Sequence, residues 1–249
     1  MKQRSIVVLS ASVVFIVAAF LIVHALESRL ERTRLMKLQE QISKPPVEPF
    51  SSGTRSETVS RSAVNWDVPF TSQAPHAVWD SFHEEACEEA SVLMVLRYFS
   101  GRPILGPDDA ERSIRHLASI NTVLGYGVDD SAEDIVAFLG SQDSSLSITI
   151  YRNPSISDLQ DSLSAGSLII VPAMGQQLHN PYFQTPGPRY HMLVLRGYTS
   201  DGYVITNDPG TRHGEQYAYR WDTLVNAIHD WNGGEVESGE KVVIVVKKS

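Results

Sequence analysis

The sequence has a single cysteine, Cys87, among its 249 residues. One thiol excludes an intramolecular disulfide framework and every zinc site that is built from several thiolates. Basic residues are scarce in the larger part of the chain: residues 63–249 carry 12 Lys and Arg against 24 Asp and Glu, whereas residues 1–62 carry nine against five. Because nucleic-acid phosphates are bound by basic surfaces, this acidic region argues against nucleic acid as a partner.

Long apolar runs are equally scarce, and the clearest one lies near the start of the chain. Residues 6–23 carry no charge and are interrupted only by two serines. At 1.5 Å per residue, a helix of about eighteen residues just spans a hydrocarbon core of about 30 Å. A cleaved secretory signal is the alternative, but the residues that follow offer only Ala25-x-Glu27 as a weak cleavage site. We therefore expect an uncleaved transmembrane anchor over residues 1–25.

Basic residues on both sides of the apolar run leave its orientation open. Lys2 and Arg4 precede it, and four more basic residues follow closely within 29–37. Counting alone would place the C-terminal side in the cytoplasm. A short basic tail directly before an apolar run is, however, typical of exported proteins. We expect a single-pass cell-membrane protein whose folded domain lies outside the cytoplasm.

The region between this anchor and the folded domain, residues 26–62, predicts a stalk and a linker. Apolar residues at helical spacing up to Ile42 predict a short charged helix. Three prolines within 45–49 and a Ser/Gly-rich stretch then predict a flexible spacer. We expect the folded domain over residues 63–249, with no internal repeat.

Hydrophobic periodicity in the folded part predicts helices first and strands afterwards. The expected helices cover 85–99, 108–118, 131–139, 155–163 and 221–231, and the expected strands cover 146–151, 168–173, 191–198, 203–207 and 242–246. A short extended segment over 66–70 contains Pro69, which favours an edge position. This order predicts an α+β fold in which a helical half packs on an antiparallel sheet half, with a cleft between them.

Cys87 falls in the first turn of the helix predicted over 85–99. Only the thiolate is a good nucleophile, and a helix N-terminus lowers the pKa of a thiol. Side chains one or two positions away on a helix point in other directions, so we expect the neighbouring carboxylates to be solvated. A buried cysteine with a purely structural role is the alternative. The carboxylates in question belong to Glu84, Glu85, Glu88 and Glu89.

A base for this thiol must come from another part of the chain. The sequence contains eight histidines, and most of them fall at the end of the apolar run, within helices or in polar loops. His191 instead heads the apolar strand 191–198, which puts its ring at the rim of the sheet. Because this strand and the helix of Cys87 belong to opposite walls of the expected cleft, His191 is the candidate general base.

A third residue is needed to orient the imidazole of His191, and Asp208 is the candidate. If Asp201-Gly202 forms a two-residue turn, the strands pair so that Asp208 shares the sheet face of His191 and Asn207 points to the other face. A three- or five-residue loop would reverse these faces. The alternative role for Asp208 is simply that of a turn former in Asp-Pro-Gly.

Four segments together resemble a known family. They are Val68-Pro69-Phe70-x-Ser72-Gln73, Ala86-Cys87-Glu88-Glu89-Ala90-Ser91, Tyr190-His191-Met192-Leu193-Val194-Leu195-Arg196-Gly197-Tyr198 and Asn207-Asp208-Pro209-Gly210. The pattern resembles the bacterial papain-like cysteine peptidases related to bacteriocin-processing peptidases, which cleave double-glycine leaders when fused to export transporters.

The resemblance covers residues 64–247 and implies a papain-like fold. It implies that Cys87 is the nucleophile, His191 the general base, Asp208 the orienting group and Gln73 the oxyanion donor. It implies a peptide or protein substrate and neither a metal nor an organic cofactor.

Two features depart from the family pattern. Glu88 stands where many relatives have glycine, and an insertion separates Gln73 from Cys87. The chain also contains no transporter or nucleotide-binding cassette, so we do not expect leader processing itself. The loop 175–189 should border the cleft, where Tyr182 and Phe183 either grip a substrate side chain or cover the sheet.

The expected function is that of a membrane-anchored thiol hydrolase that cleaves peptide bonds through a Cys-His-Asp triad. One alternative is a non-catalytic peptide- or cell-wall-binding module on the same fold. Another is an amidase or acyl-transfer enzyme that uses the same triad, because both reactions pass through the same kind of acyl-enzyme.

Overall fold

The structure is a computed structural model that describes residues 62–249. The predicted anchor over 1–25 and nearly all of the predicted stalk and linker lie outside the described residues. Among residues 62–249, no helix combines the length and the apolar character needed to cross a bilayer.

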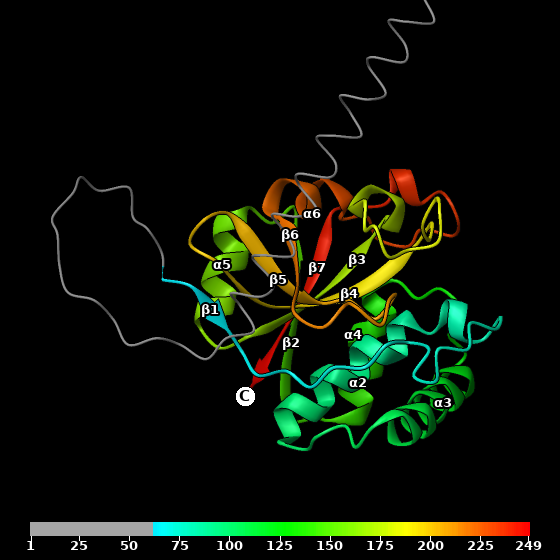
Figure 1. The fold of residues 1–249 in the computed structure, drawn as a ribbon. Helices are drawn as coiled ribbons and strands as arrows, with labels where there is room; N and C mark the ends of the chain where they lie inside the picture. The colour runs from blue at the N-terminus through cyan, green and yellow to red at the C-terminus, as the bar shows by residue number, and fades with distance from the viewer. Residues whose placement is uncertain (1–61) are drawn as a thin grey trace, which may run out of the picture. The chain divides into compact units, whose positions relative to one another are not determined.

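The centre of the fold is an antiparallel sheet whose strand order is β2-β7-β3-β4-β5-β6, with a short β1 paired to β4 (Figure 1). Strands β3 and β4 are buried along their whole length because helices cover both faces. The strands are β1 Val64–Asn65, β2 Leu146–Arg152, β3 Leu168–Ala173, β4 His191–Tyr198, β5 Tyr203–Asn207, β6 Tyr217–Arg220 and β7 Val242–Lys248.

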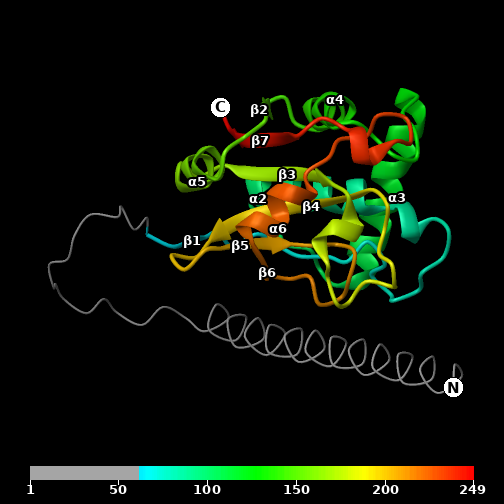
Figure 2. The same ribbon diagram turned by 90° about the horizontal axis from the view of Figure 1, so that it is seen from above.

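Helices α2, α3 and α4 pack on one face of the sheet, while α5 and α6 pack on the other (Figures 1 and 2). Three 3₁₀ turns, η1, η2 and η3, lie in the connections. The α+β architecture with an antiparallel sheet is as predicted, and the helices predicted over 155–163 and 221–231 pack on the face opposite α2, α3 and α4. The helices and turns are η1 His83–Glu85, α2 Cys87–Ser100, α3 Pro107–Leu124, α4 Ala132–Gln142, α5 Ile156–Ser164, η2 Gly175–Leu178, α6 Trp221–Ala227 and η3 Val236–Ser238.

Local sequence signals explain where several helices begin and end. Ser131 and Ser155 each form a capping box, with Asp134 and Asp158 respectively, at the starts of α4 and α5. Helix α2 ends at Ser100 and is capped by Gly101, which adopts the left-handed conformation that glycine favours. The turn η1 takes up the residues before α2, so this helix begins at Cys87 itself, two residues later than predicted.

Several other elements differ from the prediction, among them α3, which begins at residue 107 and runs to residue 124 instead of covering 108–118. Helix α6 stops at Ala227 rather than at residue 231, because Ile228 leaves the helix to form a β-bridge with Ala173. The predicted extended segment 66–70 is not a strand, and the residues that pair at the sheet are Val64–Asn65 just before it. Strand β6 was not predicted.

The hairpin between β4 and β5 differs from the predicted two-residue turn. Thr199 N–H donates to the carbonyl of Tyr203 at 2.9 Å, which leaves a three-residue loop. A β-bulge at Arg196 then shifts the register, so that Leu195 pairs with Thr206 and Val194 with Asn207. The three-residue loop would have put Asp208 on the face away from His191, and the bulge reverses the alternation again.

Candidate active site

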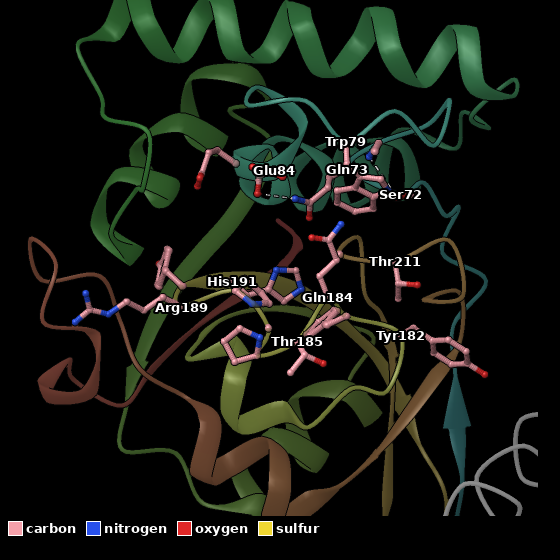
Figure 3. A pocket seen from close by; sticks show the side chains of 18 of the residues that line it. Ser72, Gln73, Trp79, Glu84, Tyr182, Gln184, Thr185, Arg189, His191 and Thr211 are labelled. Atoms are coloured by element: carbon pink, nitrogen blue, oxygen red, sulfur yellow. Dashed lines mark hydrogen bonds between the residues drawn. The ribbon is translucent and has the colours of Figure 1, made fainter.

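A cavity of about 940 Å³ opens where loops from both halves of the fold meet. One wall is formed by the segment before α2, and the facing wall by the loop that leads into β4 and the segment after β5. Figure 3 shows Gln73 and Glu84 on the first wall and His191, Gln184 and Thr185 on the facing wall. The loop before His191 therefore borders the cavity, as the sequence predicted.

The structure brings His191 and Asp208 together inside this site. The Nε2 atom of His191 lies 2.8 Å from Oδ1 of Asp208, and both side chains are buried. No hydrogen bond to the other ring nitrogen, Nδ1, occurs within the described part of the chain. Asn207 points to the opposite face, where its amide donates to the Val68 carbonyl and its oxygen accepts from Arg196.

Asp208 is held by three further hydrogen bonds. Oδ1 also accepts from the Gly210 N–H at 3.0 Å, and Oδ2 accepts from the Tyr219 hydroxyl and from Asn180 Nδ2. Burial by itself would raise the pKa of Asp208, but the charge of His191 and these donors outweigh it, so the pKa is lowered. Asp208 is thus kept ionised. Sequence reasoning missed Asn180 and Tyr219, which lie in a loop and in the unpredicted strand β6.

The ring of His191 is also confined by packing. Phe183 meets it edge-on, with ring centroids 5.3 Å apart. A Cβ atom at Gly210 would approach Cε1 of His191 to 2.8 Å, so any larger residue there would push against the ring. Phe183 therefore supports the histidine, while Tyr182 lies 41% exposed in the cavity wall and packs on His213.

Cys87 lies at the first residue of α2, which packs against β4. Its side chain is only 5% exposed and is not part of the cavity lining. The thiol donates a hydrogen bond to Oε2 of Glu88 at 2.9 Å rather than to His191. Burial, followed by the charge of Glu88, raises the pKa of Cys87 well above its ordinary value, while a hydrogen bond with the Met192 backbone acts to lower it.

The expectation that the flanking glutamates are solvated is wrong for two of the four. Glu84 and Glu85 are exposed, but Glu88 and Glu89 are 2% and 8% exposed. The first turns of α2 are buried on all sides, so even residues that point away from Cys87 remain inside the protein. Burial and the charge of Glu89 raise the pKa of Glu88 well above its usual range, and burial raises the pKa of Glu89 to about 7.

Gln73 lines the cavity and is 3% exposed. Its amide nitrogen donates to the carbonyls of His83 at 2.8 Å and Glu84 at 3.0 Å, which occupies both amide hydrogens. Its oxygen, Oε1, has no partner in the described residues. The predicted oxyanion role would require the amide to release one of these carbonyls, and it stays a prediction.

The turn that receives the Gln73 amide is anchored by His83. Its Nδ1 atom lies 2.7 Å from Asp80 Oδ1, and its Nε2 atom lies 2.9 Å from Glu111 Oε2 on α3. His83 thus ties η1 to the helical half of the fold. The sequence predicts only a polar loop at His83, because the contact with Glu111 joins residues that are 28 positions apart.

Comparisons with known proteins agree with this architecture. The site joins a buried His-Asp pair to a helix that begins with cysteine on an α+β scaffold, an arrangement of the papain-like class. The family model described as the Peptidase_C39 like family matches residues 66–233, a segment that contains all four predicted site residues. The chain belongs to this family, which confirms the resemblance found in the sequence.

Among solved structures, the fold is similar to a protein from Bacillus anthracis that is provisionally described as a C39-like peptidase. The two chains share 17% sequence identity with a TM-score of 0.51, and the match covers 76% of this chain and 100% of that one. No curated protein matches the chain. Family membership and fold together suggest a cysteine peptidase.

Proposed function

We propose that the protein is a membrane-anchored cysteine peptidase that cleaves peptide bonds through Cys87, His191 and Asp208. The observation that carries this proposal is the His191–Asp208 pair. A buried carboxylate that accepts a hydrogen bond from Nε2 fixes the tautomer whose Nδ1 is free to take a proton. It also stabilises the imidazolium that forms when the proton is taken. Support for the anchor comes from the uncharged apolar run over residues 6–23.

In the proposed reaction, His191 Nδ1 takes the proton of the Cys87 thiol, and the resulting thiolate attacks the carbonyl carbon of the scissile peptide bond. The tetrahedral intermediate collapses as His191 returns the proton to the leaving amine, which leaves an acyl group on sulfur. Water, deprotonated by His191, then hydrolyses the thioester and restores the thiol. The backbone N–H of Cys87 has no partner inside its helix and is available to the oxyanion.

The thiol has to move before this reaction can begin. In the structure it donates to Glu88, so the side chain must rotate from Glu88 toward Nδ1 of His191. Helix α2 packs against β4, the strand that begins at His191, so we propose that a change of side-chain rotamer brings the sulfur to Nδ1. We propose that substrate binding in the cavity favours this rotation.

The hydrogen bond from the Cys87 thiol to Glu88 favours a second candidate function, that of a non-catalytic peptide-binding module. A buried thiol with a raised pKa, hydrogen-bonded to a carboxylate, is a poor nucleophile. In such a module the cavity would hold an extended peptide without cleaving it.

Turnover of a peptide library by the full-length protein in detergent micelles distinguishes the two. A peptidase cleaves members of the library, and both Cys87→Ala and His191→Ala abolish cleavage while far-ultraviolet circular dichroism stays unchanged. Cleavage that survives Cys87→Ala would rule out the proposed nucleophile. Peptides that bind but are not cleaved by the wild-type protein would identify the module.

A further inference from the structure

One end of the cavity is lined by three carboxylates that have no cationic partner. Glu84 and Glu85 belong to η1, and Asp129 lies in the connection between α3 and α4. Within residues 62–249, none of the three forms an ion pair. The negative charge at this end is therefore balanced by no side chain of the described domain.

The raised pKa of Asp129 agrees with the absence of a cationic partner for these carboxylates within the described domain. Burial and the charges of Glu85 and Asp130 raise its pKa to about 6, and no cationic group acts against them. Arg189 lines the cavity as well, but it pairs with none of these carboxylates. Figure 3 shows its guanidinium directed away from Gln73 and His191.

A second, independent feature is the carbonyl oxygen of Gln73. The side chain is 3% exposed, its amide hydrogens are fixed on the His83 and Glu84 carbonyls, and Oε1 is buried without a partner. Flipping the amide would place Oε1 against those two carbonyl oxygens, so the backbone dictates its orientation. In Figure 3 this oxygen faces the cavity, toward the wall of His191. Buried polar atoms normally have a hydrogen-bond partner, so this oxygen is free to accept a hydrogen bond from a bound ligand.

Aromatic faces complete this end of the cavity. Tyr190 and Trp231 both line it and pack against each other, with ring centroids 5.5 Å apart. Carboxylates beside aromatic rings and a neutral oxygen acceptor form a surface that attracts positive charge and donors.

We propose that this end of the cavity binds a cationic group of the substrate, either the side chain of a lysine or arginine or an N-terminal ammonium. The inference rests on the proposed function, since it assigns a substrate class to the same cavity. Glu85 and Asp129 supply the charge, and Gln73 Oε1 accepts a hydrogen bond from the substrate near the scissile bond.

Peptide binding to the full-length Cys87→Ala protein tests the proposal without requiring turnover. Fluorescence anisotropy would compare labelled peptides that carry lysine, norleucine or glutamate at a single position, each with a free or an acetylated N-terminus. If the side chain is the bound cation, the lysine peptide should bind about tenfold more tightly than its norleucine counterpart at low salt, whether or not the N-terminus is acetylated. If the terminal ammonium is the bound cation, acetylation should weaken the lysine and norleucine peptides alike by about tenfold. Either difference should shrink as salt is added.

The double variant Glu85→Gln/Asp129→Asn should remove the preference for the cationic peptide, because the cationic peptide should lose more affinity than the uncharged, acetylated one. Asp222→Asn is the matched control: it removes an exposed carboxylate on α6, outside the cavity, and should keep the preference. Equal binding of all peptides, or tighter binding of the glutamate peptide, would overturn the proposal. The two proposals can fail separately. Equal binding of all peptides would overturn the cation site, whereas a wild-type protein that binds lysine peptides but does not cleave them would overturn the proposed peptidase activity.

Discussion

The Cys87 thiol donates a hydrogen bond to the carboxylate of Glu88, its neighbour in the buried first turn of α2. Many members of the family that the sequence resembles have glycine at the position of Glu88. In this chain the side chain that replaces it holds the proposed nucleophile in the protonated form and away from His191. Glu88 is therefore expected to control how reactive the thiol is.

Replacing Glu88 by glutamine should make Cys87 more reactive. Burial raises the pKa of the thiol first, and the Glu88 carboxyl group adds to this by its charge and by accepting the thiol hydrogen bond. The Glu88→Gln change removes this ionisable carboxyl group and preserves the size of the side chain. Because only the thiolate is alkylated, we expect iodoacetamide to modify the variant about tenfold faster than the wild type at pH 7.5. Glu84→Gln, which alters an exposed carboxylate of the same segment, serves as the control. An unchanged rate in Glu88→Gln would mean that Glu88 does not govern the thiol.

The buried carboxyl group of Glu89 should make the folded protein less stable as the pH rises. Its pKa is about 7 in the folded protein against the usual 4.5, so the folded state holds a proton that the unfolded chain has released. The stabilising effect is complete below about pH 4.5 and is lost as the pH rises through 7. The expected loss is roughly 3 kcal/mol. Asp129 and Asp230, each with a pKa of about 6, act in the same direction.

Urea unfolding of the full-length protein at a series of pH values measures this effect. Glu89→Gln cannot ionise, so its unfolding free energy should change less between pH 5 and pH 8 than that of the wild type. A wild-type protein whose stability increases across this range would contradict the assignment of the raised pKa.

Asp208 should matter for the chemical step rather than for substrate affinity. Without its carboxylate, the His191 ring loses its fixed tautomer and the imidazolium loses its counter-charge, so Asp208→Ala should lower kcat by roughly 10²–10³-fold with little change in KM. Asp208→Asn should be milder, because an amide oxygen can still accept from Nε2. Steady-state kinetics on a cleaved library peptide provide the measurement.

Asn207→Ala is the neighbouring comparison. Asn207 bonds the backbone of the Val68 segment and Arg196 on the other face of the sheet, so its loss should lower Tm but leave kcat of the folded fraction near that of the wild type. A larger kcat effect from Asn207→Ala than from Asp208→Ala would contradict the proposed triad.

The apolar run over residues 6–23 should keep the protein in the membrane fraction after washing with alkaline carbonate or high salt. Surface-bound proteins are released by this treatment, whereas spanning segments are retained. Protease protection on intact cells would then report the side on which the folded domain lies. Recovery of a soluble form that begins near Glu27 would show a cleaved signal instead.

Strong apolar runs made much of the sheet predictable. Strands β3, β4 and β5 begin and end where the pattern indicated, because each is a continuous buried run bounded by turn residues. Strand β6 could not be found in this way, since it is only four residues long and its three buried residues depend on pairing with β5 and on contacts with distant loops.

The pairing of His191 with Asp208 was predictable from the alternation of side chains along a strand, but the hairpin turn assumed in that prediction was wrong. The prediction that Asp208 shares the face of His191 assumed a two-residue turn, whereas the actual arrangement combines a three-residue loop with a bulge at Arg196. The loop is one residue longer than predicted and the bulge adds one further residue, so the two one-residue shifts cancel and Asp208 still shares the face of His191. The burial of Glu88 could not be read from local helix geometry, because it depends on how many elements surround the start of α2.

Detection of an acyl-enzyme on Cys87 would test most directly whether this thiol is the nucleophile. Intact-mass spectrometry of the full-length protein, quenched in acid within milliseconds of mixing with a cleaved peptide or its more reactive ester, would measure it. We expect an added mass equal to the N-terminal part of the substrate, located on Cys87 by fragmentation and absent from Cys87→Ala. Turnover without any covalent adduct, and undiminished by Cys87→Ala, would contradict it.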